Sequence, residues 1–126
     1  MALQVSGFDR ALDYKVIHQS DVKATINANT ADGPCVLRHV AIGNDGGSAD
    51  VYLKLTDGHV ASIGASTPLM VLRCPAGSNQ VYTLPDGVIF AESLSFWATS
   101  GASPLNANDP SLVSAKNTIK VTLVVT

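Results

Sequence analysis

The chain has 126 residues, a formal net charge of −2, 46% hydrophobic residues and only 14% charged residues. This length suits one domain with one core, and so apolar a composition excludes an intrinsically disordered chain. The 8 basic residues are scattered singly, which excludes the basic clusters that bind nucleic acid or membrane surfaces. A lightly charged surface instead favours permanent contact with a partner.

The amino terminus contains no basic segment followed by an apolar run. The sequence therefore predicts no signal peptide, and the protein is expected to fold in the cytoplasm. Its apolar stretches are well short of the ~20 residues that a spanning helix needs. Neither a nucleic-acid partner nor a membrane partner is expected.

Apolar residues recur with a period of two along most of the chain, which is typical of half-buried β-strands. Val51, Leu53 and Leu55 share one face of such a segment, and residues 117–126 repeat the pattern over a longer run. In chain order, the predicted strands cover residues 14–19, 22–27, 35–42, 51–56, 69–74, 80–84, 94–99 and 117–126.

Turn sequences separate these segments at intervals of about ten residues, as in sandwiches of short antiparallel strands. Asp-Gly pairs supply a short polar side chain and a residue that accepts positive φ. The sequence Leu84-Pro85-Asp86-Gly87 predicts the tight turn of a hairpin, and residues 75–78 predict another turn.

We therefore predict an all-β fold: a single antiparallel β-sandwich, jelly-roll-like, with about eight strands. The domain is expected to cover residues 12–126, and residues 1–11 are expected to form an N-terminal arm outside it. The irregular stretch 100–116 is long enough to predict a functional loop. The predicted buried residues are Val51, Leu53, Leu55, Leu94, Phe96, Ile119, Val121 and Leu123.

Residues that carry chemistry are few and do not form a known catalytic pattern. The histidines have neither a nucleophile elbow nor an oxyanion loop beside them in the sequence, and Glu92 is the only glutamate. Cys35 and Cys74 are expected to be buried free thiols rather than a disulfide or metal ligands. The sequence thus predicts no enzyme, no metal site and no cofactor.

Trp97 lies on the face of its strand opposite Leu94 and Phe96. Three roles remain open for it: a core residue, an interface with another subunit or partner, and a platform on which a sugar stacks. The sequence alone does not choose among them.

Several short motifs follow one another from about residue 36 to the end of the chain. They are Val51-Tyr52-Leu53-Lys54-Leu55, Ser66-Thr67-Pro68-Leu69, Cys74-Pro75-Ala76-Gly77, Leu84-Pro85-Asp86-Gly87-Val88-Ile89-Phe90 and the strand from Leu94 to Gly101-Ala102. In order and spacing they resemble small structural proteins of tailed bacteriophages, of the capsid decoration (cement) type. The stretch Gly101-Ala102-Ser103-Pro104 departs from that pattern, because relatives carry an acidic turn there.

This resemblance implies a virion protein that sits on the capsid surface and is assembled in the host cytoplasm. Its function would be to bind the major capsid protein shell and stabilise it across subunit boundaries, as a homo-oligomer in which a trimer is favoured over a dimer. The residues expected at partner interfaces are Phe8, Arg10 and Tyr14 in the arm, Trp97, and Pro104 and Asn106 in the loop. The alternative is that the arm is a frayed terminus and the loop is mobile.

A second function stays open, namely a phage tail, fibre or host-recognition module that binds surface carbohydrate through aromatic side chains.

Overall fold

A computed structural model describes residues 3–5, 14–23, 26–28, 30–58, 68–99 and 118–126. All the regular secondary structure in these ranges is β, so the predicted fold class is confirmed. The strands are β1 (Leu3–Val5), β2 (Lys15–Gln19), β3 (Cys35–Asn44), β4 (Val51–Asp57), β5 (Met70–Cys74), β6 (Ser78–Phe90), β7 (Leu94–Thr99) and β8 (Lys120–Val125).

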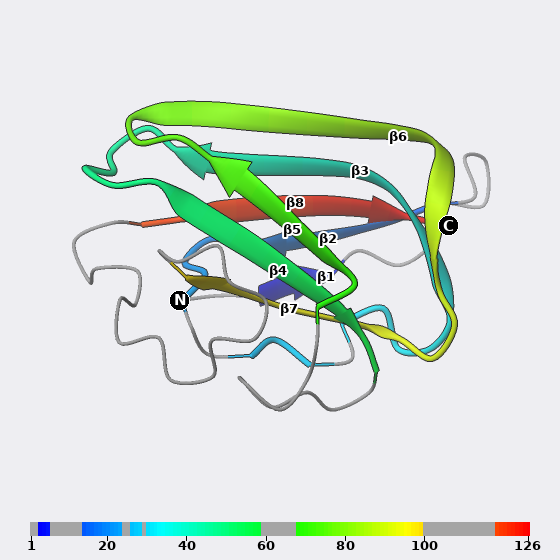
Figure 1. Ribbon diagram of the computed structural model, residues 1–126. Coiled ribbons are helices and arrows are strands. Elements are labelled where there is room, and N and C mark those ends of the chain that lie inside the picture. The colour runs from blue at the N-terminus through cyan, green and yellow to red at the C-terminus, as the bar shows by residue number, and fades with distance from the viewer. Residues whose placement is uncertain (1–2, 6–13, 24–25, 29, 59–67, 100–117) are drawn as a thin grey trace.

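The strands form two antiparallel sheets that face each other as the layers of a sandwich (Figure 1). One sheet has five strands in the order β1-β2-β8-β3-β6, and the other has three in the order β5-β4-β7. The series β2-β8-β3-β6 opposite β7-β4-β5 is the strand order of a jelly roll, in which two Greek keys wrap around one core. The predicted jelly-roll-like sandwich is therefore what the chain forms.

The segment before β3 lies along the edge of β7, where a fourth strand of the smaller sheet would be. Phe96 exchanges two backbone hydrogen bonds with Asn27, at 2.9 and 3.0 Å. On either side, the amide of Ala98 donates to the carbonyl of Lys23 at 2.9 Å and that of Thr30 to Leu94 at 2.8 Å. A full strand over 22–27 was predicted; the described residues form one isolated bridge there, at Asn27, and residues 24–25 lie outside the description.

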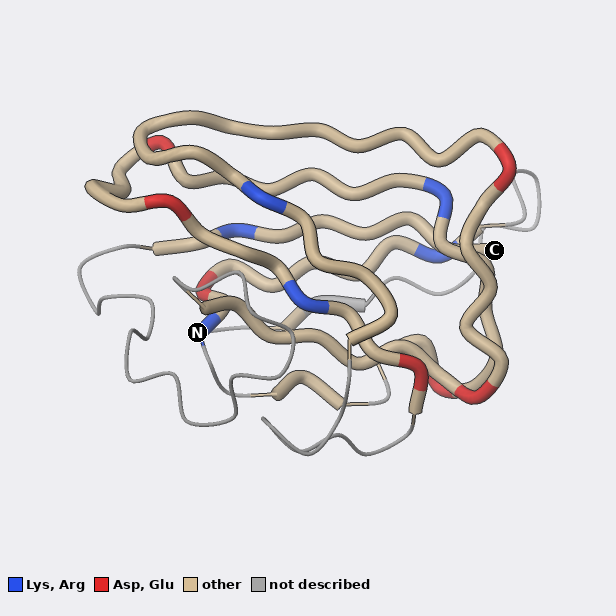
Figure 2. Tube along the Cα trace, viewed as in Figure 1, with Lys and Arg blue, Asp and Glu red and all other residues tan. Residues whose placement is uncertain are grey.

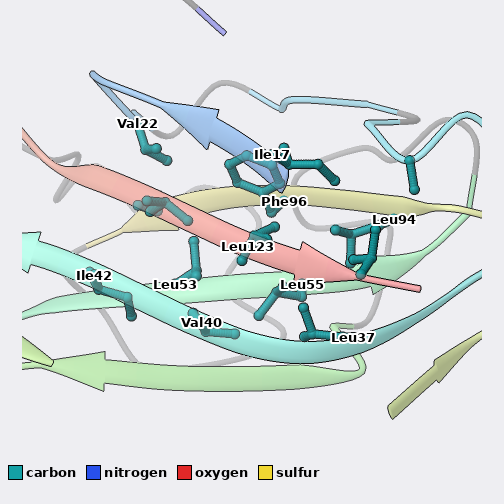
Figure 3. Close-up of a cluster of buried hydrophobic side chains, with 14 of the residues drawn as sticks. Ile17, Val22, Leu37, Val40, Ile42, Leu53, Leu55, Leu94, Phe96 and Leu123 are labelled. Atoms are coloured by element: carbon teal, nitrogen blue, oxygen red, sulfur yellow. The ribbon is translucent and has the colours of Figure 1, made fainter. Parts of the chain in front are cut away.

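The core fills the space between the sheets, and its side chains come from both layers (Figure 3). All the residues predicted to be buried from the period-two pattern are buried. Cys35 and Cys74 also lie in this core as free thiols. Burial of this apolar surface is the main source of stability for the fold.

The predicted hairpin turn at residues 84–87 is wrong, because β6 continues through it. Thr83 of β6 pairs with His39 of β3, and pairing resumes with Val88 opposite Leu37, so residues 84–87 bulge out opposite Arg38. The turn prediction was right about the backbone of Gly87, which adopts a φ of 72°. The bulge tolerates Pro85, which has no amide to donate, and Figure 1 shows β6 bending sharply there.

Gly87→Ala is expected to lower the free energy of unfolding by about 2–3 kcal/mol. An alanine there would keep the unfavourable positive φ, and its Cβ would overlap Cγ1 of Val36. The matched control is Gly77→Ala, where φ is 68° but the nearest atom to a new Cβ is 4.0 Å away; about 1 kcal/mol is expected. Urea unfolding measures both, and equal losses would show that the overlap with Val36 is harmless.

Part of the predicted N-terminal arm belongs to the sandwich. Leu3–Val5 pairs with β2 in the register Leu3↔Gln19, Gln4↔His18 and Val5↔Ile17. The boundary at residue 11 is thus wrong for residues 3–5, which extend the larger sheet by one strand. Residues 6–13 lie outside the described part of the chain.

Candidate interaction surface

The two sheets differ in the accessibility of their outer faces. On the smaller sheet, Lys54 of β4 pairs with Trp97 of β7, and both point away from the core because they alternate with Leu53, Leu55 and Phe96. Lys54 is nevertheless only 1% exposed and Trp97 only 2%. Every residue of β7 is buried, so this sheet is buried on both faces along β7.

The larger sheet has an accessible outer face, which we call the open face. Its centre consists of two rows of side chains that cross β2, β8, β3 and β6, and all of them are half-buried or exposed. The cross-strand register gives the rows. They are His18-Thr122-Ala41-Val81 and Val16-Val124-His39-Thr83.

The open face is weakly polar, and none of its eight residues is an Asp, Glu, Lys or Arg. Most of its side chains are small or β-branched, and a side-chain hydrogen bond joins Nδ1 of His18 to Oγ1 of Thr122 at 2.8 Å. Basic residues flank it on β3 and β8, where Arg38 and Lys120 are exposed; Figure 2 shows uncharged chain between them. Such a face can cover a flat partner without desolvating a charge.

The predicted interface residues are scattered relative to this face. Tyr14 is half-buried next to the start of β2, and Trp97 is buried on the other sheet. Trp97 is 2% exposed but lies outside the core cluster between the sheets, so its position supports neither a place in that core nor an accessible partner contact or sugar platform. Phe8, Arg10, Pro104 and Asn106 lie outside the described residues.

The alternating pattern contained a signal for the open face that the sequence interpretation did not use. Thr122 sits between the predicted core residues Val121 and Leu123, so it must point outward. The sequence gives no sign, however, of which outer face is covered, because Lys54 occupies the same kind of position on β4 and is buried.

The thiols have little nucleophilic character at neutral pH. Burial, and to a smaller degree the nearby carboxylate of Asp57, raise the pKa of Cys35 to about 11 against the opposing effect of Lys15. Burial also raises the pKa of Cys74. Since the thiolate is the reactive form, neither cysteine is an activated nucleophile.

The carboxylates of Asp50 and Asp57 support turns. Asp57 accepts hydrogen bonds from the backbone amides of residues 91–93, at 2.8 to 3.3 Å. Asp50 accepts two from Arg73, at 3.0 and 2.8 Å, and one from the amide of Ala76. The hydrogen bonds from Arg73 are the largest cause of the lowered pKa of Asp50.

The described residues offer little support for a metal site, a membrane span or a catalytic pocket. Within them, no group of three or more His, Cys, Asp or Glu side chains could hold a metal ion, and no helix is long and apolar enough to cross a membrane. The bulge of β6 borders an open hollow of about 200 Å³ lined by residues 84–88. Asp86 is its only titratable residue, so it offers no pair of groups for catalysis.

No protein-family model matches the chain, and no curated protein matches it either. Among solved structures, the chain is similar to one described as "Bacillus endospore appendages form a novel family of disulfide-linked pili", with a TM-score of 0.41 and 14% identity, over 100% of this chain and 91% of that one. It also matches a Drosophila melanogaster CENP-C cupin domain, with a TM-score of 0.25 and 6% identity, over 97% of this chain and 67% of that one. Likeness this low carries no argument about function.

Proposed function

We propose that this chain is a structural, non-enzymatic protein of a tailed-phage virion that decorates the capsid. It binds the shell of major capsid protein and stabilises that shell across subunit boundaries. The observation that supports this proposal is the open face, a broad, uncharged sheet surface beside a second sheet that is buried on both faces along β7. The jelly-roll fold occurs in capsid and lectin domains, but this is an analogy of fold and not of site.

The chemistry of the open face suits a lasting contact better than a transient one. Burial of Val16, Ala41 and Val124 against a partner would remove apolar surface from water, which stabilises the complex. The hydroxyls of Thr83 and Thr122 can bond to a partner or to interfacial water. A cement protein requires this combination, because its contact with the shell must persist without catalysis or release.

Ala41→Arg is expected to weaken binding to the shell by about tenfold or more. Ala41 lies at the centre of the open face, between Thr122 and Val81, where a guanidinium would be buried without a counter-charge. The probe is the empty, expanded shell of the major capsid protein encoded in the same genome. Binding is measured by co-sedimentation over a range of protein concentrations.

The matched control is Ala49→Arg, which makes the same replacement at an exposed position beyond the end of β3. We expect this variant to bind the shell as the unchanged protein does. Equal binding by all three proteins would exclude the open face as the contact. If the unchanged protein failed to bind the shell but bound glycans on an array, the proposal would fall in favour of carbohydrate recognition.

A further inference from the structure

The outer edge of β6 is the most accessible strand edge in the described part of the fold. β6 ends the five-stranded sheet and pairs only with β3 there. Its other side presents backbone N–H and C=O groups with no strand opposite them, as any edge strand does. Its straight first half, residues 78–84, is long enough to pair with another strand over about 23 Å.

The remaining edges are shorter or closed. β1 has three residues and β5 has five, and on β5 Arg73 is held by Asp50 at 2.8 Å. The edge of β7 is bonded to the segment that contains Asn27 and Thr30. The edge of β6 therefore differs from the others in being both long and unoccupied within the described residues.

The first half of β6 also lacks the features that usually protect an edge strand. Such features are charged side chains, proline and bulges, and residues 78–84 contain none of them. All of them begin immediately afterwards, at Pro85, Asp86 and the bulge that ends at Gly87. Figure 2 shows the same contrast, with an uncharged run along β6 that ends at an acidic residue by the bend.

We propose that residues 78–84 pair antiparallel with the same residues of a second copy, about a two-fold axis at Val81. The two five-stranded sheets then join into one continuous sheet, and the two open faces become one surface. This inference does not depend on the capsid function, because it concerns only the edge of β6. It favours a two-fold pair over the trimer that the family resemblance implies.

The register about this axis is self-complementary. Val81 lies opposite Val81 of the second copy, and Asn79 lies opposite Thr83 of that copy, all on the side of the open face. Val81 is 57% exposed in the single chain, and pairing would cover it with another β-branched residue, a favourable cross-strand pair. On the other side, Gln80 meets Tyr82 of the second copy, and the hydroxyl of Tyr82 already donates to the carbonyl of Arg73.

These residues favour a second copy of the chain as the partner that pairs with the edge of β6. In this register no charged side chains meet, and the central pairs, Val81 with Val81 and Asn79 with Thr83, match in size and polarity. A two-fold contact uses the same patch on both molecules and closes on itself. The bend at Pro85 limits the pairing to the straight half of β6, which fixes where the contact ends.

Val81→Arg tests the proposal, because it places two guanidinium groups opposite each other at the axis. By sedimentation velocity, the unchanged protein should have twice the mass of the 13.1 kDa chain. The variant should dissociate about 100-fold more readily, since like charges brought together in an interface cost several kcal/mol. The matched control is Ile89→Arg, also on β6 and 71% exposed, which lies beyond the bulge and should leave the mass unchanged.

A second measurement covers the case in which Val81→Arg does not fold. Val81→Cys should be joined to a second copy by a short bifunctional maleimide, whereas Ile89→Cys should not, and the native Cys35 and Cys74 are buried. A monomeric or trimeric mass for the unchanged protein would overturn the proposal. Equal masses for Val81→Arg and the unchanged protein would overturn it as well.

Discussion

Asn44→Asp is expected to lower the free energy of unfolding by about 3–5 kcal/mol. The side chain of Asn44 is buried at the end of β3, and its Nδ2 donates to the carbonyls of Ala49, Pro75 and Cys74 at 2.9, 3.2 and 3.4 Å. An isosteric carboxylate would face these oxygens with no proton to give them. The side-chain amide of Asn44 thus links the β3–β4 turn to the β5–β6 turn.

The loss should depend on pH. The introduced carboxyl is neutral when protonated, and burial among carbonyl oxygens favours that form, so its pKa rises above the ~3.9 of an unfolded chain. The folded variant therefore binds its proton more tightly than the unfolded variant, and its stability falls as the pH rises above about 4. Urea titrations at several pH values measure this slope relative to the unchanged protein.

The control is Ser48→Asp, which introduces the same carboxylate at an exposed position in the β3–β4 turn. A change within about 0.5 kcal/mol is expected there. If Asn44→Asp unfolded at the same urea concentration as this control, the contacts of Asn44 would not be important for stability.

Phe96→Ala is also expected to cost about 3–5 kcal/mol. The ring of Phe96 is fully buried between the sheets, on the strand that pairs with β4 (Figure 3). Its backbone bonds to Asn27 do not involve the side chain, so the substitution isolates the lost packing and the cavity left behind. Equilibrium unfolding in urea gives the loss directly.

Two further variants calibrate that loss. Ile89→Ala removes a large apolar side chain that is exposed rather than buried, and should change the stability by less than about 0.5 kcal/mol. Phe96→Leu keeps most of the volume and should retain most of the stability. A loss from Phe96→Ala no larger than that from Ile89→Ala would contradict the observed core.

The sequence predicted best those features that depend on local periodicity. The strand over residues 94–99 was predicted to the residue, and the alternation of Leu53 with Lys54 placed the correct side chains in the core. Side chains in a strand alternate by geometry alone, so this pattern requires no knowledge of the partner strands.

Features that depend on distant pairing were not predictable in the same way. Gly87 takes the positive φ that its turn signature indicates, but whether such a residue ends a strand or forms a bulge depends on its pairing with β3. The outward position of Thr122 was predictable, whereas the burial of Lys54 on the equivalent face of β4 was not. Of the predicted interface residues, Trp97 is buried and Tyr14 lies beside β2.

The segment along β7 has a consequence for how the molecule associates. It is bonded to Phe96 and Ala98 in one layer, and the amide of Val22 donates to the carbonyl of Ile119 beside β8 in the other, at 2.8 Å. These hydrogen bonds cover the edge of β7, whereas the edge of β6 has no strand opposite it among the described residues. Among the described residues β6 has the longest uncovered edge, so the pairing proposed for it joins two copies and leaves only the short edges of β1 and β5 for further growth.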